Sequence, residues 1–151
     1  MIRPLQPNEE LPWDLLLDAD PEKEIVDGYI HQSEIGILER DNKIVGCIVF
    51  QIRSNEAELM NVAVDSNYQK QGLGAALVEY ALKEIGEKKP FTPFSVLVKT
   101  GNSTLPALAL YKSQGFKEIQ QIKDYFLTHY SEPIYEEGML LTDQIILSQI
   151  I

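Results

Sequence analysis

Residues 59–77 read LMNVAVDSNYQKQGLGAAL, so an apolar strand pattern runs through a polar turn into a helix pattern that opens with glycines. The first backbone N–H groups of a helix have no partner inside the helix and lie at the positive end of its dipole. Glycine at such a position lets an anion approach the backbone closely. The stretch therefore predicts a phosphate-binding turn between a strand and a helix.

The spacing of Gly72 and Gly74 distinguishes known phosphate-binding loops. A dinucleotide fingerprint needs a third glycine where the chain has Leu77, and a nucleotide P-loop needs Gly-Lys-Ser/Thr, which is absent from this turn. The simplest alternative is that the glycines only permit a tight connection. A turn needs at most one glycine, and each glycine inside a helix costs about 1 kcal/mol relative to Ala. We therefore favour close approach of a ligand.

The spacing Gln69-x-x-Gly72-x-Gly74, with a turn at Asp65 directly after the strand, resembles the acyl-CoA-binding motif of the GNAT superfamily of N-acyltransferases. Residues 102–116 are similar to a second motif of this family. The tail at 124–138 resembles small uncharacterised bacterial members. The resemblance extends over nearly the whole chain and implies an acetyl-CoA-dependent N-acetyltransferase.

Length and composition are those of one ordinary domain over residues 1–151. Apolar residues make up 44% and charged residues 24%, which predicts a soluble globular protein. The N-terminus lacks the apolar core of a signal peptide, and no run is long enough to span a bilayer. The single cysteine, Cys47, suits a reducing compartment. We expect a cytoplasmic protein without a membrane partner, in which Cys47 is a core residue or, alternatively, an acyl-accepting thiol.

The net charge of −10 argues against nucleic acid as a partner, because nucleic acid binding needs a basic face. An acidic surface favours cationic partners, although the charge also serves solubility. His31 and His129 are isolated in the sequence, so we expect no metal. The oligomeric state is open, and a homodimer is compatible with the sequence.

Hydrophobic periodicity predicts an α+β fold. Strands are expected at 1–5, 34–39, 43–53, 56–64, 92–99, 116–122 and 139–149. Helices are expected at 9–17 and 21–30, from 73 to about 86, and from a cap at Ser103 or Thr104 to about Gln114. The unit from 56 to 99 requires a right-handed crossover between parallel strands. We predict a GNAT-like mixed, mostly antiparallel sheet of about seven strands flanked by about four helices.

By the resemblance, acetyl-CoA is the co-substrate, and its pantetheine arm lies where a distortion parts the strand at 59–64 from the strand at 95–99. The backbone of Val62 and Val64 would hold this arm, and the Val64 region would polarise the thioester carbonyl. Asn102 stands nine residues before Tyr111, a longer spacing than the family pattern. The resemblance assigns these residues to acetyl-CoA: Val62, Ala63, Val64, Lys70, Gln71, Gly72, Leu73, Gly74, Ala75 and Asn102.

Two residues are candidates for proton transfer. Tyr111 matches the family tyrosine that protonates the leaving thiolate, but its spacing also fits a core aromatic. Glu58 is a candidate base, because strand alternation predicts that it shares a face with Met60, Val62 and Val64. The alternatives are that Glu58 is a solvated carboxylate at the strand end and that water carries the proton, since the other family position for a base is the apolar Leu97.

The acceptor site is expected near the end of the chain. Tyr125, His129, Tyr130 and Glu132, with Tyr135 and Glu136-Glu137 beyond them, form an aromatic and acidic cluster that suits the primary amine of a small cationic molecule or peptide. The alternative is a packed, partly solvated loop. A second functional class also stays open, namely a catalytically idle CoA-binding regulatory or interaction domain.

Overall fold

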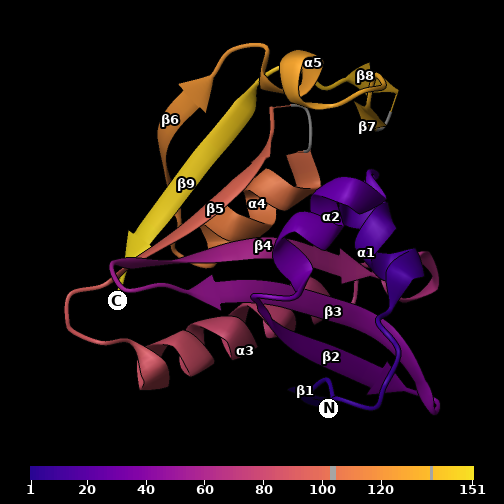
Figure 1. Cartoon of the computed structure of the whole chain (residues 1–151), viewed down its shortest axis with the longest axis vertical. Coiled ribbons are helices and arrows are strands. Elements are labelled where there is room, and N and C mark those ends of the chain that lie inside the picture. The colour runs from indigo at the N-terminus through magenta and orange to yellow at the C-terminus, as the bar shows by residue number, and fades with distance from the viewer. Residues whose placement is uncertain (103–104, 137) are drawn as a thin grey trace.

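The computed structural model describes residues 1–102, 105–136 and 138–151. Its main feature is one sheet of seven strands in the order β1-β2-β3-β4-β5-β9-β6 (Figure 1). The strands of this sheet are β1 (Ile2–Pro4), β2 (Glu34–Arg40), β3 (Lys43–Ile52), β4 (Glu56–Val64), β5 (Ser95–Gly101), β6 (Lys117–Ile122) and β9 (Gln144–Ile150). A second sheet pairs β7 (Tyr135–Glu136) with β8 (Met139–Leu140).

The helices are α1 (Trp13–Ala19), α2 (Lys23–Ile30), α3 (Leu73–Lys88), α4 (Leu105–Ser113) and α5 (Tyr125–His129), with a 3-10 turn at Ser66–Tyr68. In the main sheet β4 and β5 are parallel, and every other neighbouring pair is antiparallel. The α+β, mostly antiparallel architecture of about seven strands is therefore confirmed. One more helix, α5, lies where a loop was expected.

The two faces of the sheet carry separate cores. On one face α3 packs through Leu77, Val78 and Ala81 against strand residues such as Val45 and Ile48, and Tyr111 of α4 belongs to the same cluster. On the other face Leu16 of α1 and Val26 of α2 pack against β2, β3 and β4. Burial of such apolar side chains is the main source of stability. In Figure 1, α5 and the β7–β8 pair lie above α1 and α2, at the end of the molecule where β5 and β9 rise away from β4.

Strand β4 is interrupted at Met60. The β3–β4 register passes from Val49↔Asn61 to Phe50↔Leu59, so Met60 is an extra residue and forms a β-bulge. The parallel β4–β5 pairing covers Glu56–Leu59 and Ser95–Val98 and stops there. Beyond this point the two strands part, as the sequence analysis expected, and Figure 1 shows β5 rising away from β4.

The bulge corrects one prediction about β4. Val62 and Val64 pack with the core beneath α3, whereas Met60 and Ala63 pack with the core beneath α1 and α2. Glu58 lies on the Met60 side, because Arg53 contacts both Glu58 Oε1 and Met60 Sδ. The expectation that Glu58, Met60, Val62 and Val64 share one face is wrong, since a bulge reverses the alternation.

Several predicted boundaries also need correction. Helix α1 begins at Trp13 rather than at residue 9, because the Glu9 carboxylate is bound by Arg3 and by the backbone N–H of Gln6. Helix α3 continues through Gly86 to Lys88. The strand expected at 139–149 is two strands, β8 and β9, in different sheets.

This last break has a local cause. The N–H of Leu141 bonds to Ile134 O, and the Asn102 side chain accepts the N–H groups of Thr142 and Asp143. The backbone of 141–143 is therefore satisfied outside the ladder. The cap expected at Ser103 or Thr104 and the acidic Glu137 lie outside the described residues. Within the described ranges, no helix has both the length and the apolar character needed to cross a membrane.

Candidate active site

A cleft of about 820 Å³ opens where β4 and β5 part. Residues of β4 from Glu58 to Val64 form its floor, and Val98 to Gly101 of β5 line the other edge. The start of α3 and residues of α4 close one side, while residues of the α1–α2 region and of the segment 125–141 close the other. The cleft therefore connects the predicted phosphate-binding turn with the predicted acceptor region.

The turn before α3 has a backbone arrangement suited to an anion. Gly72 is the N-terminal cap with a φ of 77°, and Lys70 also has a positive φ of 63°. The Gln69 side chain donates to Val64 O at 3.0 Å and so ties the turn to the end of β4. The first helical bond runs from Ala76 N to Gly72 O, which leaves the three preceding N–H groups without a helical partner.

Glycine is favoured at the two positions of the turn for different structural causes. Gly72 needs its positive φ, and no atom lies within 4 Å of the position that a Cβ would take. A Cβ on Gly74 would lie 3.3 Å from Leu110 Cδ2, so this glycine allows close packing of α3 against α4. The argument that both glycines serve a ligand therefore applies to Gly72, while Gly74 has a packing role of its own.

Most residues assigned to acetyl-CoA surround the cleft. Those that line it are Val62, Ala63, Val64, Lys70, Gly72, Leu73 and Gly74. Gln71 and Ala75 do not line it, although Ala75 carries one of the unpaired N–H groups. Asn102 is also outside the cleft, because its amide group bonds to Thr142 and Asp143 and so connects the end of β5 to the start of β9.

Tyr111 lines the cleft and is 7% exposed. Its ring meets Phe116 edge to face at 6.0 Å, and it belongs to the core beneath α3. Burial raises the pKa of Tyr111 well above the ordinary value, so the hydroxyl stays protonated at neutral pH. The position is consistent with a proton donor and equally with a core aromatic.

Glu58 lines the cleft but is not a solvated carboxylate, since it is 5% exposed. Its Oε1 lies 3.0 Å from Arg53 Nη2, and its Oε2 lies 3.7 Å from Lys99 Nζ. Arg53 and Lys99 also line the cleft. A role for Glu58 as base stays a prediction, and both of its oxygens already have a cationic partner.

Comparison with known proteins identifies the family. A family model described as an acetyltransferase (GNAT) domain matches residues 31–118. This chain belongs to the GNAT family of acetyltransferases. The uncharacterized N-acetyltransferase YvbK of Bacillus subtilis (strain 168) is 38% identical over 140 residues, which cover 91% of this chain and 87% of YvbK.

Of two further relatives, one has a bound ligand and the other has a named acceptor. A GNAT family acetyltransferase from Elizabethkingia anophelis, solved with acetyl-CoA bound, superposes with a TM-score of 0.92 at 34% identity, covering 100% of this chain and 97% of the other. The [ribosomal protein bS18]-alanine N-acetyltransferase of Escherichia coli (strain K12) is 37% identical over 91 residues, 60% of each chain. The fold and the family inferred from the sequence are thus confirmed.

The four predicted acceptor residues of this GNAT chain separate into two pairs. Tyr125 and Tyr130 line the cleft. His129 stacks on the Tyr125 ring at 4.1 Å, with its Nδ1 3.0 Å from Tyr125 O, and it is exposed outside the cleft. Glu132 is also exposed and does not line the cleft.

Sequence reasoning missed several polar residues of the GNAT cleft, among them Asp20, Tyr29 and Asn61. Tyr29 donates to Asp20 Oδ2 at 3.2 Å, and Tyr130 donates to Asp20 Oδ1 at 2.9 Å. Asn61 Nδ2 donates to the Tyr29 hydroxyl at 3.1 Å. The one sequence signal was Asn61 itself, a polar residue inside the apolar run of β4.

Cys47 does not contribute to this site. It is fully buried between the sheet and α1–α2, and burial raises the pKa of its thiol to about 12. A thiol of this kind is hardly ionised at neutral pH and is a poor nucleophile. The structure therefore favours the core interpretation of Cys47 over the acyl-accepting thiol.

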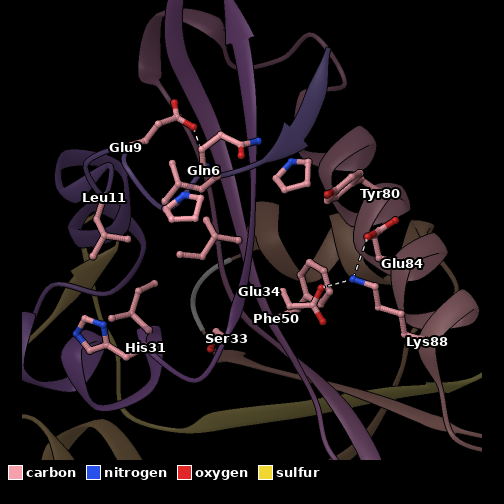
Figure 2. Close-up of a pocket in the computed structure, with 15 residues that line it drawn as sticks. Gln6, Glu9, Leu11, His31, Ser33, Glu34, Phe50, Tyr80, Glu84 and Lys88 are labelled. Atoms are coloured by element: carbon pink, nitrogen blue, oxygen red, sulfur yellow. Dashed lines mark hydrogen bonds and ion pairs between the residues drawn. The ribbon is translucent and has the colours of Figure 1, made fainter.

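A second hollow, of about 460 Å³, lies between the N-terminal segment and α3 (Figure 2). Figure 2 shows Lys88 between Glu34 and Glu84, at 2.6 and 3.4 Å, with Tyr80 nearby. Glu9, at the other end, is bound by Arg3. Glu34 and Glu84 share Lys88, and Glu9 is paired with Arg3, so these carboxylates are engaged in ion pairs. The cleft at β4, which contains the glycine turn and Tyr111, is the candidate active site.

Proposed function

We propose that this GNAT acetyltransferase transfers the acetyl group of acetyl-CoA to a primary amine of a small cationic molecule or peptide, by direct attack of the amine on the thioester. One observation carries the proposal: a single cleft joins the glycine turn, the parted strands and Tyr111. The bS18-alanine enzyme, which by its name acetylates an alanine of a ribosomal protein, gives a precedent for a peptide amine among relatives.

The residues present suit acetyl-CoA. Unpaired N–H groups at the start of α3 and the open space beside Gly72 fit a pyrophosphate. Lys70, which also lines the cleft, supplies a positive charge close by. The unpaired edges of β4 and β5 beyond Leu59 and Val98 offer backbone groups to the pantetheine arm. Bound acetyl-CoA would supply an activated acetyl group.

Starting from the neutral amine, the reaction needs two proton transfers. The amine nitrogen forms a bond to the thioester carbon, and the bond from carbon to sulfur breaks. Tyr111 gives its proton to the departing thiolate. The hydroxyl must carry its proton for this step, and burial raises its pKa, so it is protonated at neutral pH. The proton of the amine leaves through Glu58 or through water, and the ion pairs of Glu58 with Arg53 and Lys99 orient its carboxylate.

Two observations favour a second function, a CoA-binding domain without catalysis. Both oxygens of Glu58 are engaged by cations, and the Tyr111 ring packs as a core residue. Such a domain would use the glycine turn and have no need of either side chain.

The test is an acceptor screen. The protein is incubated with acetyl-CoA and a panel of cationic, neutral and anionic amines, and both free thiol and the mass of acetylated product are measured. Acetylation of cationic amines is expected. Tight CoA binding with no acetylated product from any amine would favour the second function, and acetylation of anionic acceptors alone would overturn the proposed substrate class.

A further inference from the structure

Four polar residues at the acceptor end of the cleft form one hydrogen-bonded group, which we call the Asp20 cluster: Asp20, Tyr29, Asn61 and Tyr130. They come from the α1–α2 connection, α2, β4 and the residue after α5. Asn61 is 4% exposed and Tyr29 is 8% exposed, while Asp20 and Tyr130 are half-buried. All four line the cleft.

The geometry assigns a direction to each hydrogen bond of the Asp20 cluster when the Asp20 carboxyl is ionised. Asn61 Nδ2 donates to Leu16 O at 3.0 Å, and a flipped amide would place two oxygens in contact there. Tyr29 therefore accepts from Asn61 and donates its own proton to Asp20. Tyr130 likewise donates to Asp20. Both hydroxyl protons point to the carboxylate, so the cluster keeps acceptor positions and has no proton left to offer.

Two features show that the cluster lacks donors. Asn61 Oδ1 is buried and has no hydrogen-bond partner, the one such side-chain atom found among the described residues. A buried acceptor without a partner is costly and rare in native proteins. In addition, no ion pair of the described residues includes Asp20. Burial raises the pKa of this carboxyl, and the hydrogen bonds from the two tyrosine hydroxyls offset only part of that increase.

The chemistry of the ligand follows from this polarity. A group with N–H donors and a positive charge would pair with the Asp20 carboxylate, whereas a carboxylate or phosphate finds no free donor in the cluster and meets a like charge. The rings of Tyr125 and Phe126 also line this end and suit a cation. The half-buried Asp20 is the member that a ligand in the cleft reaches.

A cation held by Asp20 would not be the nitrogen that attacks. An amine must lose its proton before it attacks a thioester, and a carboxylate partner keeps an ammonium protonated. We propose that Asp20 binds a second positive group of the acceptor, so that the preferred substrates carry two basic groups, as diamines do. This inference rests on the proposed function, because it concerns the acceptor of that same reaction.

The closing experiment compares a linear diamine with the amino alcohol of equal length, in which a hydroxyl replaces the second amino group. Steady-state rates are measured at saturating acetyl-CoA for the wild type and for Asp20→Asn. Wild type should have a kcat/KM for the diamine that is roughly 10- to 100-fold higher, the range expected for a hydrogen-bonded charge. Asp20→Asn should abolish this preference through the KM for the diamine, and the KM for acetyl-CoA should stay constant.

Glu24→Gln is the matched control. It removes one carboxylate from the neighbouring helix, where Glu24 is exposed and outside the cleft, and the preference for the diamine should persist. Equal loss in both variants would mean a general charge effect and would overturn the inference. Equal use of diamine and amino alcohol by the wild type would overturn it too, whether or not Asp20→Asn folds. The absence of acetylation with any amine would instead contradict the proposed function.

Discussion

The two ends of the cleft are built in different ways. The turn before α3 is mostly local: apart from the bonds of Asp65 N to Val45 O and of the Tyr68 hydroxyl to Asp41, its hydrogen bonds run between residues 64 and 76. Its chemistry lies in backbone N–H groups and one glycine. The Asp20 cluster is assembled from distant segments, with Tyr130 bonded to a residue 110 positions earlier, and its chemistry lies in side chains. Backbone chemistry of this local kind can be read from a short motif, whereas a cluster of side chains depends on the whole fold.

This comparison predicts separable effects, because catalysis, CoA binding and acceptor binding use different groups. The largest concerns Tyr111, which lies on the α4 side of the cleft. Tyr111→Phe keeps the ring contact with Phe116 and removes only the hydroxyl. We expect kcat to fall by roughly 10²–10⁴-fold, the usual effect of a lost proton transfer, with CoA affinity unchanged by calorimetry. Unchanged turnover would show that Tyr111 serves only in packing and does not donate a proton.

The next effect concerns the turn. Gly72→Val places a β-branched side chain at a φ of 77° and covers the unpaired N–H groups. We expect CoA affinity by calorimetry to fall by about tenfold or more, a change of about 1.4 kcal/mol or more, in a protein that still unfolds cooperatively. The acceptor end is distant in sequence and should keep its preference among amines. A folded Gly72→Val protein with wild-type CoA affinity would remove the basis of the phosphate-binding assignment.

A smaller effect should appear in salt dependence. Because the net charge is −10 and the proposed acceptor is cationic, kcat/KM for a cationic amine should fall severalfold between about 0.01 and about 0.5 M salt. The measurement uses saturating acetyl-CoA, so that screening of the anionic CoA does not contribute. A neutral acceptor serves as control and should show little change. Equal salt dependence for both would mean that electrostatic attraction of the acceptor is absent.

The smallest expected effect is on stability, and it concerns Gly86, a glycine to which no ligand contact is assigned. Gly86 lies near the far end of α3, is exposed, and has no atom within 4 Å of the place of a Cβ. Gly86→Ala should therefore raise the free energy of unfolding by about 0.5–1 kcal/mol in a denaturant titration. CoA affinity should not change. A loss of stability would show that Gly86 has a role that its surroundings do not reveal.

The sequence supported a good part of the fold. The strands 34–39, 43–53 and 56–64 were predicted almost to the residue, since short polar turns at 40–42 and 54–55 separate clear apolar runs. The glycine turn was located for the same local reason. The resemblance implied a distortion in the strand at 59–64, but its place at Met60 was not predicted from the residues, because no glycine or proline marks it. It depends on how β3 and β4 pair, which periodicity within one strand does not report.

Some residues of the candidate site were also predicted from the sequence, and others were not. Tyr111 and most residues of the turn line the cleft, although Gln71 and Ala75 do not, and the roles of these residues stay predictions. Asn102 lies outside the cleft and is bonded to Thr142 and Asp143. Asp20 and Tyr29 gave no signal, since an acidic residue before a helix and an aromatic residue within one are ordinary features. Their meaning comes from contact with Asn61 and Tyr130, which only the tertiary structure brings about.

The claim that backbone N–H groups at the start of α3 hold the phosphates of CoA is tested most directly by NMR. CoA is titrated into the nitrogen-15-labelled protein, and the amide resonances are followed. We predict the largest shifts at residues 70–76, with Gly72 and Gly74 among them, and small shifts at Glu34, Tyr80 and Lys88 of the second hollow. Largest shifts at the second hollow, with the amides of 70–76 unmoved, would contradict the assignment of the cleft as the acetyl-CoA site.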